Sequence, residues 1–177
     1  RHRGAGVAGP HAWEHYWKIF DRGVAVFGLG KVGVHLIAGL GETEEELIRL
    51  MAEIRERGGC THLFSFCPEP GSSLAREGVP PPPMASYRRI QLARFLIEVR
   101  GAEAKQFSFA PDGTMREAGL TAEGLDGVIR DGRAFQTSGC PDEATGEVAC
   151  TRPFGNSPPD PGSGTCPIPS TTRIGGG

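Results

Sequence analysis

The chain has 177 residues, enough for one domain or for part of a larger one, and its formal net charge is −2 at pH 7. A charge so close to neutral gives no indication of a nucleic-acid partner. No run of about 20 apolar residues indicates a membrane-spanning helix. The N-terminus is basic and glycine-rich but has no apolar signal-peptide core, so we expect a cytoplasmic protein.

The first predicted element is a helix over residues 11–27, where apolar side chains recur at helical spacing. We interpret its large apolar residues as core-packing side chains; they are Trp13, Tyr16, Trp17, Phe20, Val24 and Phe27. Because the chain opens on Arg1, and on a helix rather than a strand, we expect a fragment that lacks an N-terminal part.

The glycines of residues 28–33 match the pattern G-x-G-x-x-G. A dinucleotide-binding fingerprint follows a strand and opens a helix, whereas this match follows a helix and opens a strand. We therefore interpret Gly28 as the end of the helix. A nucleotide-dependent oxidoreductase is disfavoured for the same reason.

The next stretch combines a strand, a glycine turn and a helix start. The apolar run over residues 32–38 predicts a strand buried on both faces, and Gly39 and Gly41 predict a tight turn. Thr43 and Glu46 have the spacing of a capping box. A helix N-terminus behind a glycine turn is typical of a site for an anionic or nucleotide-like ligand. A tight turn without a ligand is the alternative that the local pattern leaves open.

A helix over residues 43–57 and a second strand over residues 61–66 complete a βαβ unit, in which the strands run parallel. Ligands of such units bind at the C-terminal ends of the strands. Beyond it we expect a polyproline spacer, a helix, a hairpin and a short helix, over residues 80–83, 85–100, 105–118 and 121–130.

The chain has five cysteines, an odd number that argues against a disulfide scaffold in the absence of a secretion signal. Cys140 and Cys150 lie in glycine- and proline-rich stretches, where they could ligate a metal or an iron–sulfur cluster. Without C-x-x-C pairs the spacing does not indicate zinc, and by itself it favours reduced, inert thiols.

Residues 35–46 read His-Leu-Ile-Ala-Gly-Leu-Gly-Glu-Thr-Glu-Glu-Glu, and residues 61–72 read Thr-His-Leu-Phe-Ser-Phe-Cys-Pro-Glu-Pro-Gly-Ser. With residues 87–95 and 137–156, they resemble radical S-adenosylmethionine (SAM) proteins. The resemblance is closest to the biotin-synthase-like and lipoyl-synthase-like branch, including the two-component archaeal-type lipoyl synthases. It implies an α/β fold, the C-terminal part of a partial (β/α)6 TIM-like barrel with an irregular cysteine-containing tail.

In that superfamily the fifth barrel strand carries a G-x-I-x-G-x-x-E motif that packs against the nucleoside of SAM. Ile37, Gly39 and Glu42 match it, whereas His35 stands where the first glycine is expected. We interpret His35 as a packed, hydrogen-bonded core residue, with a substrate or cofactor contact as the alternative.

The sixth strand of the superfamily and its Pro-x-x-Gly turn lie beside the adenine, and Phe66, Pro68 and Gly71 match that description. The resemblance therefore implies that these residues also bind the cofactor. Adenine recognition needs a flat apolar surface with backbone polar groups beside it, and a glycine turn next to a Phe-Pro strand end offers both.

The superfamily's catalytic signature is C-x-x-x-C-x-x-C, whose thiolates hold the [4Fe–4S] cluster that cleaves SAM to a 5′-deoxyadenosyl radical. This spacing does not occur in the chain. The resemblance thus implies a fragment that is inactive alone, assigns no catalytic residue, and points to a missing N-terminal half or a partner subunit. The substrate would be a small molecule or a carrier-bound group, with sulfur insertion as the reaction of this branch.

The tail Thr-Ser-Gly-Cys-Pro, followed by Val-Ala-Cys-Thr-Arg-Pro-Phe-Gly-Asn, looks in this branch like a ligand region for an auxiliary [4Fe–4S] cluster. That likeness reverses the preference from spacing alone and implies that Cys140 and Cys150 are metal ligands. Cys166 lies beyond the matching region and is not assigned.

The expected organisation is a disordered N-terminal segment, barrel units, an extension with a hairpin, a short helix and a cluster loop, and a disordered tail. These cover residues 1–10, 11–100, 101–156 and 157–177. The alternative function is a non-catalytic half-barrel that binds a metal or a partner and pairs with another chain.

Overall fold

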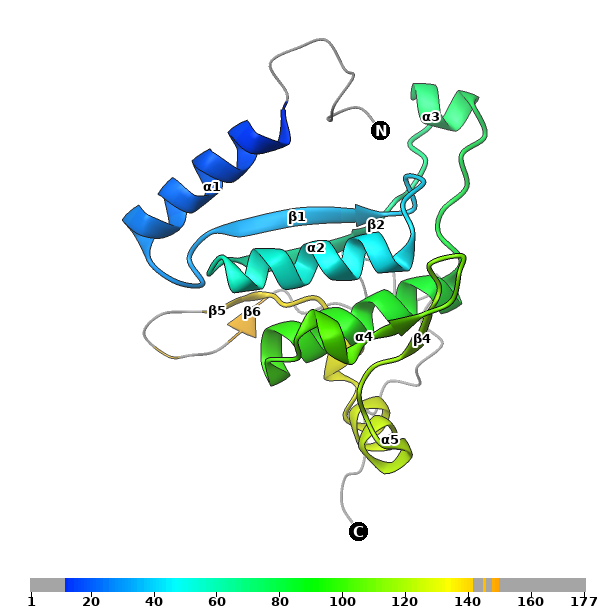
Figure 1. The fold of residues 1–177 in the computed structure, drawn as a ribbon. Coiled ribbons are helices and arrows are strands. Elements are labelled where there is room, and N and C mark those ends of the chain that lie inside the picture. Colours follow the sequence, from blue (N-terminus) through cyan, green and yellow to red (C-terminus); the bar gives the residue numbers. More distant parts are fainter. Residues whose placement is uncertain (1–11, 142–144, 146–147, 150–177) are drawn as a thin grey trace.

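The computed structural model describes residues 12–141, 145 and 148–149 (Figure 1). The segments expected to be disordered, residues 1–10 and 157–177, lie outside the described residues. The elements are, in chain order, α1 (Trp13–Phe27), β1 (Gly33–Ala38), α2 (Glu44–Glu56), β2 (Cys60–Ser65), α3 (Ser73–Arg76), α4 (Met84–Arg100), the 3-10 helix η1 (Ala104–Gln106), β3 (Ser108–Phe109), β4 (Met115–Glu117), α5 (Ala122–Asp131), the 3-10 helix η2 (Arg133–Phe135), β5 (Cys140–Pro141) and β6 (Val148–Ala149).

β1 and β2 form a parallel pair joined by α2, which confirms the predicted βαβ unit. The register places Gly33 opposite Cys60 and Ala38 opposite Ser65. Within the described residues, three separate two-stranded sheets form. The fold is therefore a mixture of helices and strands compatible with the α/β class, and no barrel is shown.

Helices cover one face of the β1–β2 pair. α2 and α4 pack against each other and against the strands, in layers that Figure 1 shows below β1. Leu36 and Ala38 are buried on the helix side, whereas His35 and Ile37 alternate with them and are exposed. The prediction of a strand buried on both faces is therefore wrong for the described part of the chain, because α2 and α4 lie on one side only.

The start of α2 has the capping box that the sequence predicts. The Thr43 hydroxyl accepts a hydrogen bond from the Glu46 amide at 3.1 Å, and the Glu46 carboxylate accepts one from the Thr43 amide at 2.7 Å. These bonds satisfy two N–H groups at the helix start and lower the pKa of Glu46. The apolar stripe of α2 is buried at Leu47, Met51 and Ile54.

A buried ion pair joins α2, α4 and the β3–β4 hairpin. Glu44 is 7% exposed and pairs with Arg89, with distances of 2.9 Å from Oε2 to Nε and 2.6 Å from Oε1 to Nη2. Glu44 Oε2 also accepts a hydrogen bond from the Met115 amide at 2.8 Å. Burial raises the pKa of Glu44, but these bonds outweigh burial and hold it below the ordinary glutamate value.

α1 lies beside the beginning of β1 and packs less of its apolar surface than the sequence predicts. Phe20 is its buried residue, whereas Trp13 is 47% and Phe27 is 70% exposed. Arg57, just after α2, lies with its guanidinium carbon 4.3 Å from the centre of the Trp17 ring and pairs with Asp21 at 2.9 Å. The interpretation of the α1 side chains as core residues is therefore confirmed for Phe20, against which Trp17 packs, and is wrong for Trp13 and Phe27.

The C-terminal part contains the predicted hairpin and short helix. β3 and β4 pair antiparallel, and α5 begins after Thr121, whose hydroxyl accepts a hydrogen bond from the Gly124 amide. The first hairpin strand starts later than predicted, at Ser108. The cause is the 3-10 turn before it, whose start is capped by reciprocal side-chain to backbone bonds between Glu103 and Gln106.

Candidate functional site

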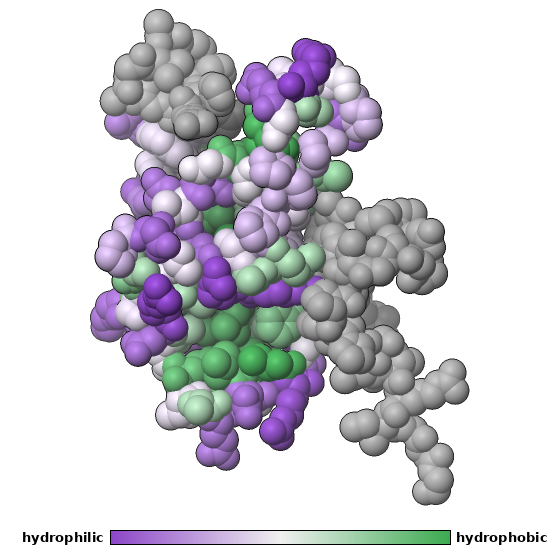
Figure 2. Space-filling view, turned by 90° about the vertical axis from the view of Figure 1, so that its right-hand side faces the viewer, coloured by the Kyte–Doolittle hydropathy of each residue, from purple (hydrophilic) through white to green (hydrophobic). Residues whose placement is uncertain are grey.

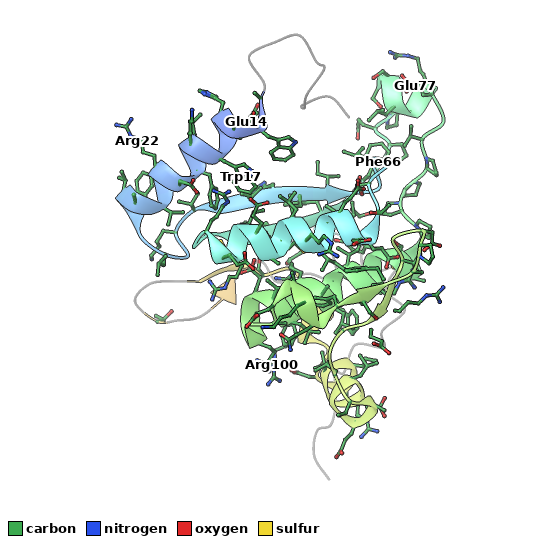
Figure 3. The ribbon with its side chains drawn as sticks, in the orientation of Figure 1. Glu14, Trp17, Arg22, Phe66, Glu77 and Arg100 are labelled. Atoms are coloured by element: carbon green, nitrogen blue, oxygen red, sulfur yellow. The ribbon has the colours of Figure 1, made fainter. Side chains whose placement is uncertain are left out.

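The C-terminal ends of β1 and β2 lie side by side, as the βαβ prediction requires. Ala38 and Ser65 are register partners, and the Phe66 amide donates a hydrogen bond to the Ala38 carbonyl at 2.7 Å. Figure 3 shows Phe66 at this end of the strand pair. The turn that begins at Gly39 and the segment that begins at Phe66 therefore leave the sheet at one place.

The glycine turn is held by the carboxylate of Glu42. Its two oxygens accept hydrogen bonds from the Gly39 amide at 2.5 Å and from the Leu40 amide at 3.0 Å. Gly39 and Gly41 have φ angles of 104° and 103°, in the region that favours glycine. The first two N–H groups of the turn, those of Gly39 and Leu40, are thus already paired with an anion of the chain itself.

The missing side chain of Gly39 makes room for the polyproline segment. A Cβ at Gly39 would lie 2.7 Å from Cδ of Pro82 and 3.1 Å from its nitrogen. The close approach that the sequence predicts at this glycine is therefore an approach of the chain to itself. Gly41 remains exposed, and Leu40 is 40% exposed, so the turn is covered on one side only.

Apolar surface is present at the same end of the molecule. Ile37 is 45% exposed, and Phe66 and Pro68 are half-buried. Figure 2 faces this end and shows apolar residues among polar ones. Gly71 lies further out, before the short helix α3, with a φ of 85° and no atom within 4 Å of the position that a Cβ would take. Ile37, Gly39, Glu42 and Phe66 are therefore brought together more closely than Gly71 is.

Two histidines face each other on the open side of the sheet. His35 and His62 are register partners, and their rings meet edge to face with centres 5.3 Å apart. The centre of the Phe64 ring lies 5.1 Å from the centre of the His35 ring. His35 is exposed, so the interpretation of it as a packed core residue is wrong. The alternative, that His35 contacts a substrate or cofactor, stays a prediction.

His62 also connects the sheet to the tail. Its Nδ1 lies 2.8 Å from the hydroxyl oxygen of Ser138, which precedes β5. Burial, together with the neighbouring His35 and Arg94, lowers the pKa of His62, so its ring is neutral at pH 7. The start of the tail therefore lies against the open face of the β1–β2 pair.

The cysteines divide into two groups. Burial raises the pKa of the Cys60 thiol, which favours the protonated, unreactive form, and Cys67 is exposed. In the tail, the backbone of Cys140 pairs with Ala149. The side chain of Cys140, and all of Cys150 and Cys166, lie outside the described residues. Among the residues that are described, no three His, Cys, Asp or Glu side chains are arranged to hold a metal ion.

Comparison with known proteins adds no assignment: no family model, no curated protein and no solved structure matches the chain. In the described ranges, none of the helices combines the length and the apolarity that crossing a bilayer requires.

Two residues of the site, Pro82 and Ser138, were not predicted, and Glu42 was predicted as a site residue but not as the residue that holds the turn. Pro82 and Ser138 reach it from 43 and 76 positions along the chain, and nothing in the local sequence indicates either contact. The bonds from Glu42 could have been predicted, because a glutamate three residues after Gly39 is close enough to accept hydrogen bonds from the turn amides.

Proposed function

We propose that this chain is part of a radical SAM iron–sulfur enzyme of the biotin- or lipoyl-synthase-like branch and forms the nucleoside side of its SAM pocket. One observation carries the proposal. The parallel pairing brings the Gly39 turn and Phe66, which lie in the two motifs that resemble this superfamily, to one end of the sheet.

The residues at the strand ends fit a nucleoside with a positively charged sulfur. Ile37 and Phe66 offer apolar surface on which the face of a purine can lie. Glu42 places a carboxylate in the turn, and a carboxylate complements a cationic ligand better than an anionic one. The same residue keeps the turn in the shape that the pocket would need.

The chain's own residues would position the cofactor and leave its cleavage to another part of the enzyme. When bound, SAM would supply the radical that abstracts hydrogen from an unactivated carbon. The chain has no C-x-x-x-C-x-x-C sequence to hold the cluster that cleavage of SAM requires. The chain would therefore be inactive alone. The substrate, a small molecule or a carrier-bound group, would meet the open face on which His35 and Phe64 lie.

We extend the proposal to Cys140 and Cys150 as ligands of an auxiliary [4Fe–4S] cluster. Two contacts support it. Ser138 bonds to His62 and so brings the start of the tail to the open face, and Cys140 pairs with the residue that precedes Cys150. Thiolates in a loop are the ligands that such clusters use.

Equilibrium dialysis with radiolabelled SAM tests the nucleoside site on the anaerobically reconstituted chain. We expect Phe66→Ala to weaken binding about tenfold, since stacking a base on an aromatic ring contributes about 1–3 kcal/mol. Phe109→Ala is the matched control, because Phe109 is half-buried in the hairpin. Failure to retain SAM, or equal losses for both variants, would contradict the proposal.

Iron and sulfide analysis tests the auxiliary site separately. The reconstituted wild type should hold about four irons per chain, the content of one [4Fe–4S] cluster. The variant Cys140→Ala with Cys150→Ala should lose them, whereas Cys67→Ala, at an exposed thiol before α3, should keep them. A wild type without iron would remove the tail site and leave the nucleoside proposal to the dialysis result.

A further inference from the structure

The outer edge of β2 is closed by a side chain of α4. The amides of Cys60 and Phe66 donate hydrogen bonds to β1, and in a parallel pair alternate residues bond to the same neighbour. The backbone groups of Thr61 therefore face away from β1. The Glu98 carboxylate accepts hydrogen bonds from the Thr61 amide at 2.8 Å and from its hydroxyl at 2.7 Å. Glu98 thus occupies the place where a further strand would pair.

Three polar side chains of α4 hold the segment that follows α5. Arg88 and Gln91 donate hydrogen bonds to the Phe135 carbonyl at 3.4 and 3.3 Å. Arg94 donates one to the Gln136 carbonyl at 3.1 Å. The three donors are spaced three residues apart, so they lie on one face of the helix. Gln91 is 2% and Arg94 is 4% exposed. Because burying an unpaired polar group is costly, this face of α4 favours a segment that brings carbonyl groups to it.

Two residues later, the same segment reaches the other face of the sheet. The Ser138 hydroxyl oxygen lies 2.8 Å from Nδ1 of His62, a residue whose ring is on the open face with that of His35. Because α4 packs on the opposite face, the chain changes sides between Gln136 and Ser138. Two residues span at most about 7 Å. The segment therefore crosses directly over the edge that Glu98 closes.

The His62 ring is itself confined. A Cβ at Gly33 would lie 2.9 Å from Nε2 of His62, so the missing side chain of Gly33 makes room for the ring. The His35 ring meets it edge to face, with centres 5.3 Å apart. These two neighbours restrict the ring, so Nδ1 is directed at Ser138 with little further loss of entropy when the bond forms.

We propose that residues 136–138 form a strap across the edge of β2, and that His62 is the positioning residue that fastens the end of the strap through Ser138. The bonds from α4 lie before the crossing, whereas the bond to His62 lies after it and two residues before Cys140. His62 therefore sets where the Cys140 segment starts on the open face. The strap needs no metal, and only its role for Cys140 rests on the proposed auxiliary cluster.

Substitutions at His62 can separate the bond to Ser138 from the rest of the ring. The side-chain amide of asparagine reaches the position of Nδ1 and that of glutamine the position of Nε2, and each amide can donate and accept. His62→Asn should therefore keep the bond, whereas His62→Gln and His62→Ala should lose it. Ser138→Ala removes the bond at an exposed residue. Ser108→Ala is the matched control, since that hydroxyl bonds to Glu117 in the hairpin.

Nitrogen-15 relaxation of the Gly139 amide in the metal-free chain reports whether the strap is fastened. We expect an order parameter of about 0.85, typical of rigid backbone, in the wild type, His62→Asn and Ser108→Ala. Loss of one hydrogen bond should shift the balance between fastened and released strap about fivefold. The order parameter should therefore fall in His62→Gln, His62→Ala and Ser138→Ala, toward the flexible range below about 0.6. Amide exchange at Leu36 and Leu63 checks that each variant keeps the strand pair.

Three results would overturn the inference. The first is a flexible Gly139 amide in the wild type. The second is an equal order parameter in His62→Asn and His62→Gln, which would mean that the contact at Nδ1 does not fasten the strap. The third is an unchanged order parameter in Ser138→Ala, which would mean that the bonds from α4 hold the segment without His62.

Iron analysis distinguishes the strap from the proposed function. A reconstituted wild type without iron would remove the auxiliary cluster, and the relaxation measurement would still decide the strap. If the wild type holds iron, His62→Gln should lose it at an about fivefold lower chelator concentration than His62→Asn. Equal loss from these two variants would contradict the positioning role of His62 for Cys140.

Discussion

Removing the Glu44 carboxylate should destabilise the fold far more than removing its neighbour Glu45. In Glu44→Ala the buried Met115 amide loses its acceptor, which costs about 1–3 kcal/mol. The two bonds from Arg89 add about 1 kcal/mol, because this side chain is 36% exposed and its charge is screened by solvent. The free energy of unfolding should fall by about 3 kcal/mol, which lowers Tm by about 6–12 °C for a chain of this size.

Glu45→Ala is the matched control, since Glu45 also lies in the first turn of α2 and pairs with Arg49 at 2.8 Å. That pair is exposed and one helical turn apart, so its loss should cost about 0.5 kcal/mol. Urea unfolding at pH 7 measures both variants. Equal destabilisation by the two substitutions would refute the reasoning from burial.

The pH dependence of the Glu44 effect gives a second check. Because the folded state holds the pKa of Glu44 below its ordinary value, its carboxylate stabilises the fold above that value. The contribution disappears as the pH falls through the folded-state pKa, since both states are then protonated. The gap between wild type and Glu44→Ala should therefore be constant near neutral pH and narrow in acid, below about pH 4.

Three further predictions concern the site and its supports. Thr43→Ala should lower the free energy of unfolding by about 1 kcal/mol, because it removes the cap of α2, as thermal unfolding would show. Gly39→Ala should cost more than Gly71→Ala, since both residues have positive φ but Gly39 alone would meet Pro82; equal losses in urea unfolding would contradict this. Because its pKa is lowered on folding, His62 should make the fold less stable as the pH falls below about 6.5, and His62→Gln should flatten that profile.

The βαβ unit could be predicted because its signals are local. Thr43 and Glu46 are three residues apart and bond to each other as their types suggest, and the apolar stripe of α2 follows from its spacing alone. The same holds for the Thr121 cap of α5. In each case the residues that decide the structure lie within one helical turn.

Burial of β1 and α1 could not be predicted in the same way. The apolar run that includes Ile37 has no period that shows whether one or both faces of the strand are buried. Burial of β1 is decided by where α2 and α4 pack, which the local sequence does not indicate. For α1, the helical spacing was correct, but Trp13 and Phe27 are exposed because little of the described chain lies opposite them. The Ser138 contact to His62 depends on the path of the whole tail.

α1 is fixed in place by contacts at its C-terminal half. The Phe20 ring lies where a side chain on Gly59 would be, Asp21 pairs with Arg57, and Val32 packs on Gly23. The helix therefore cannot settle onto β1 and close the space between them. That space therefore keeps its walls in place while it is empty, and any molecule that entered it would lose mainly its own conformational entropy.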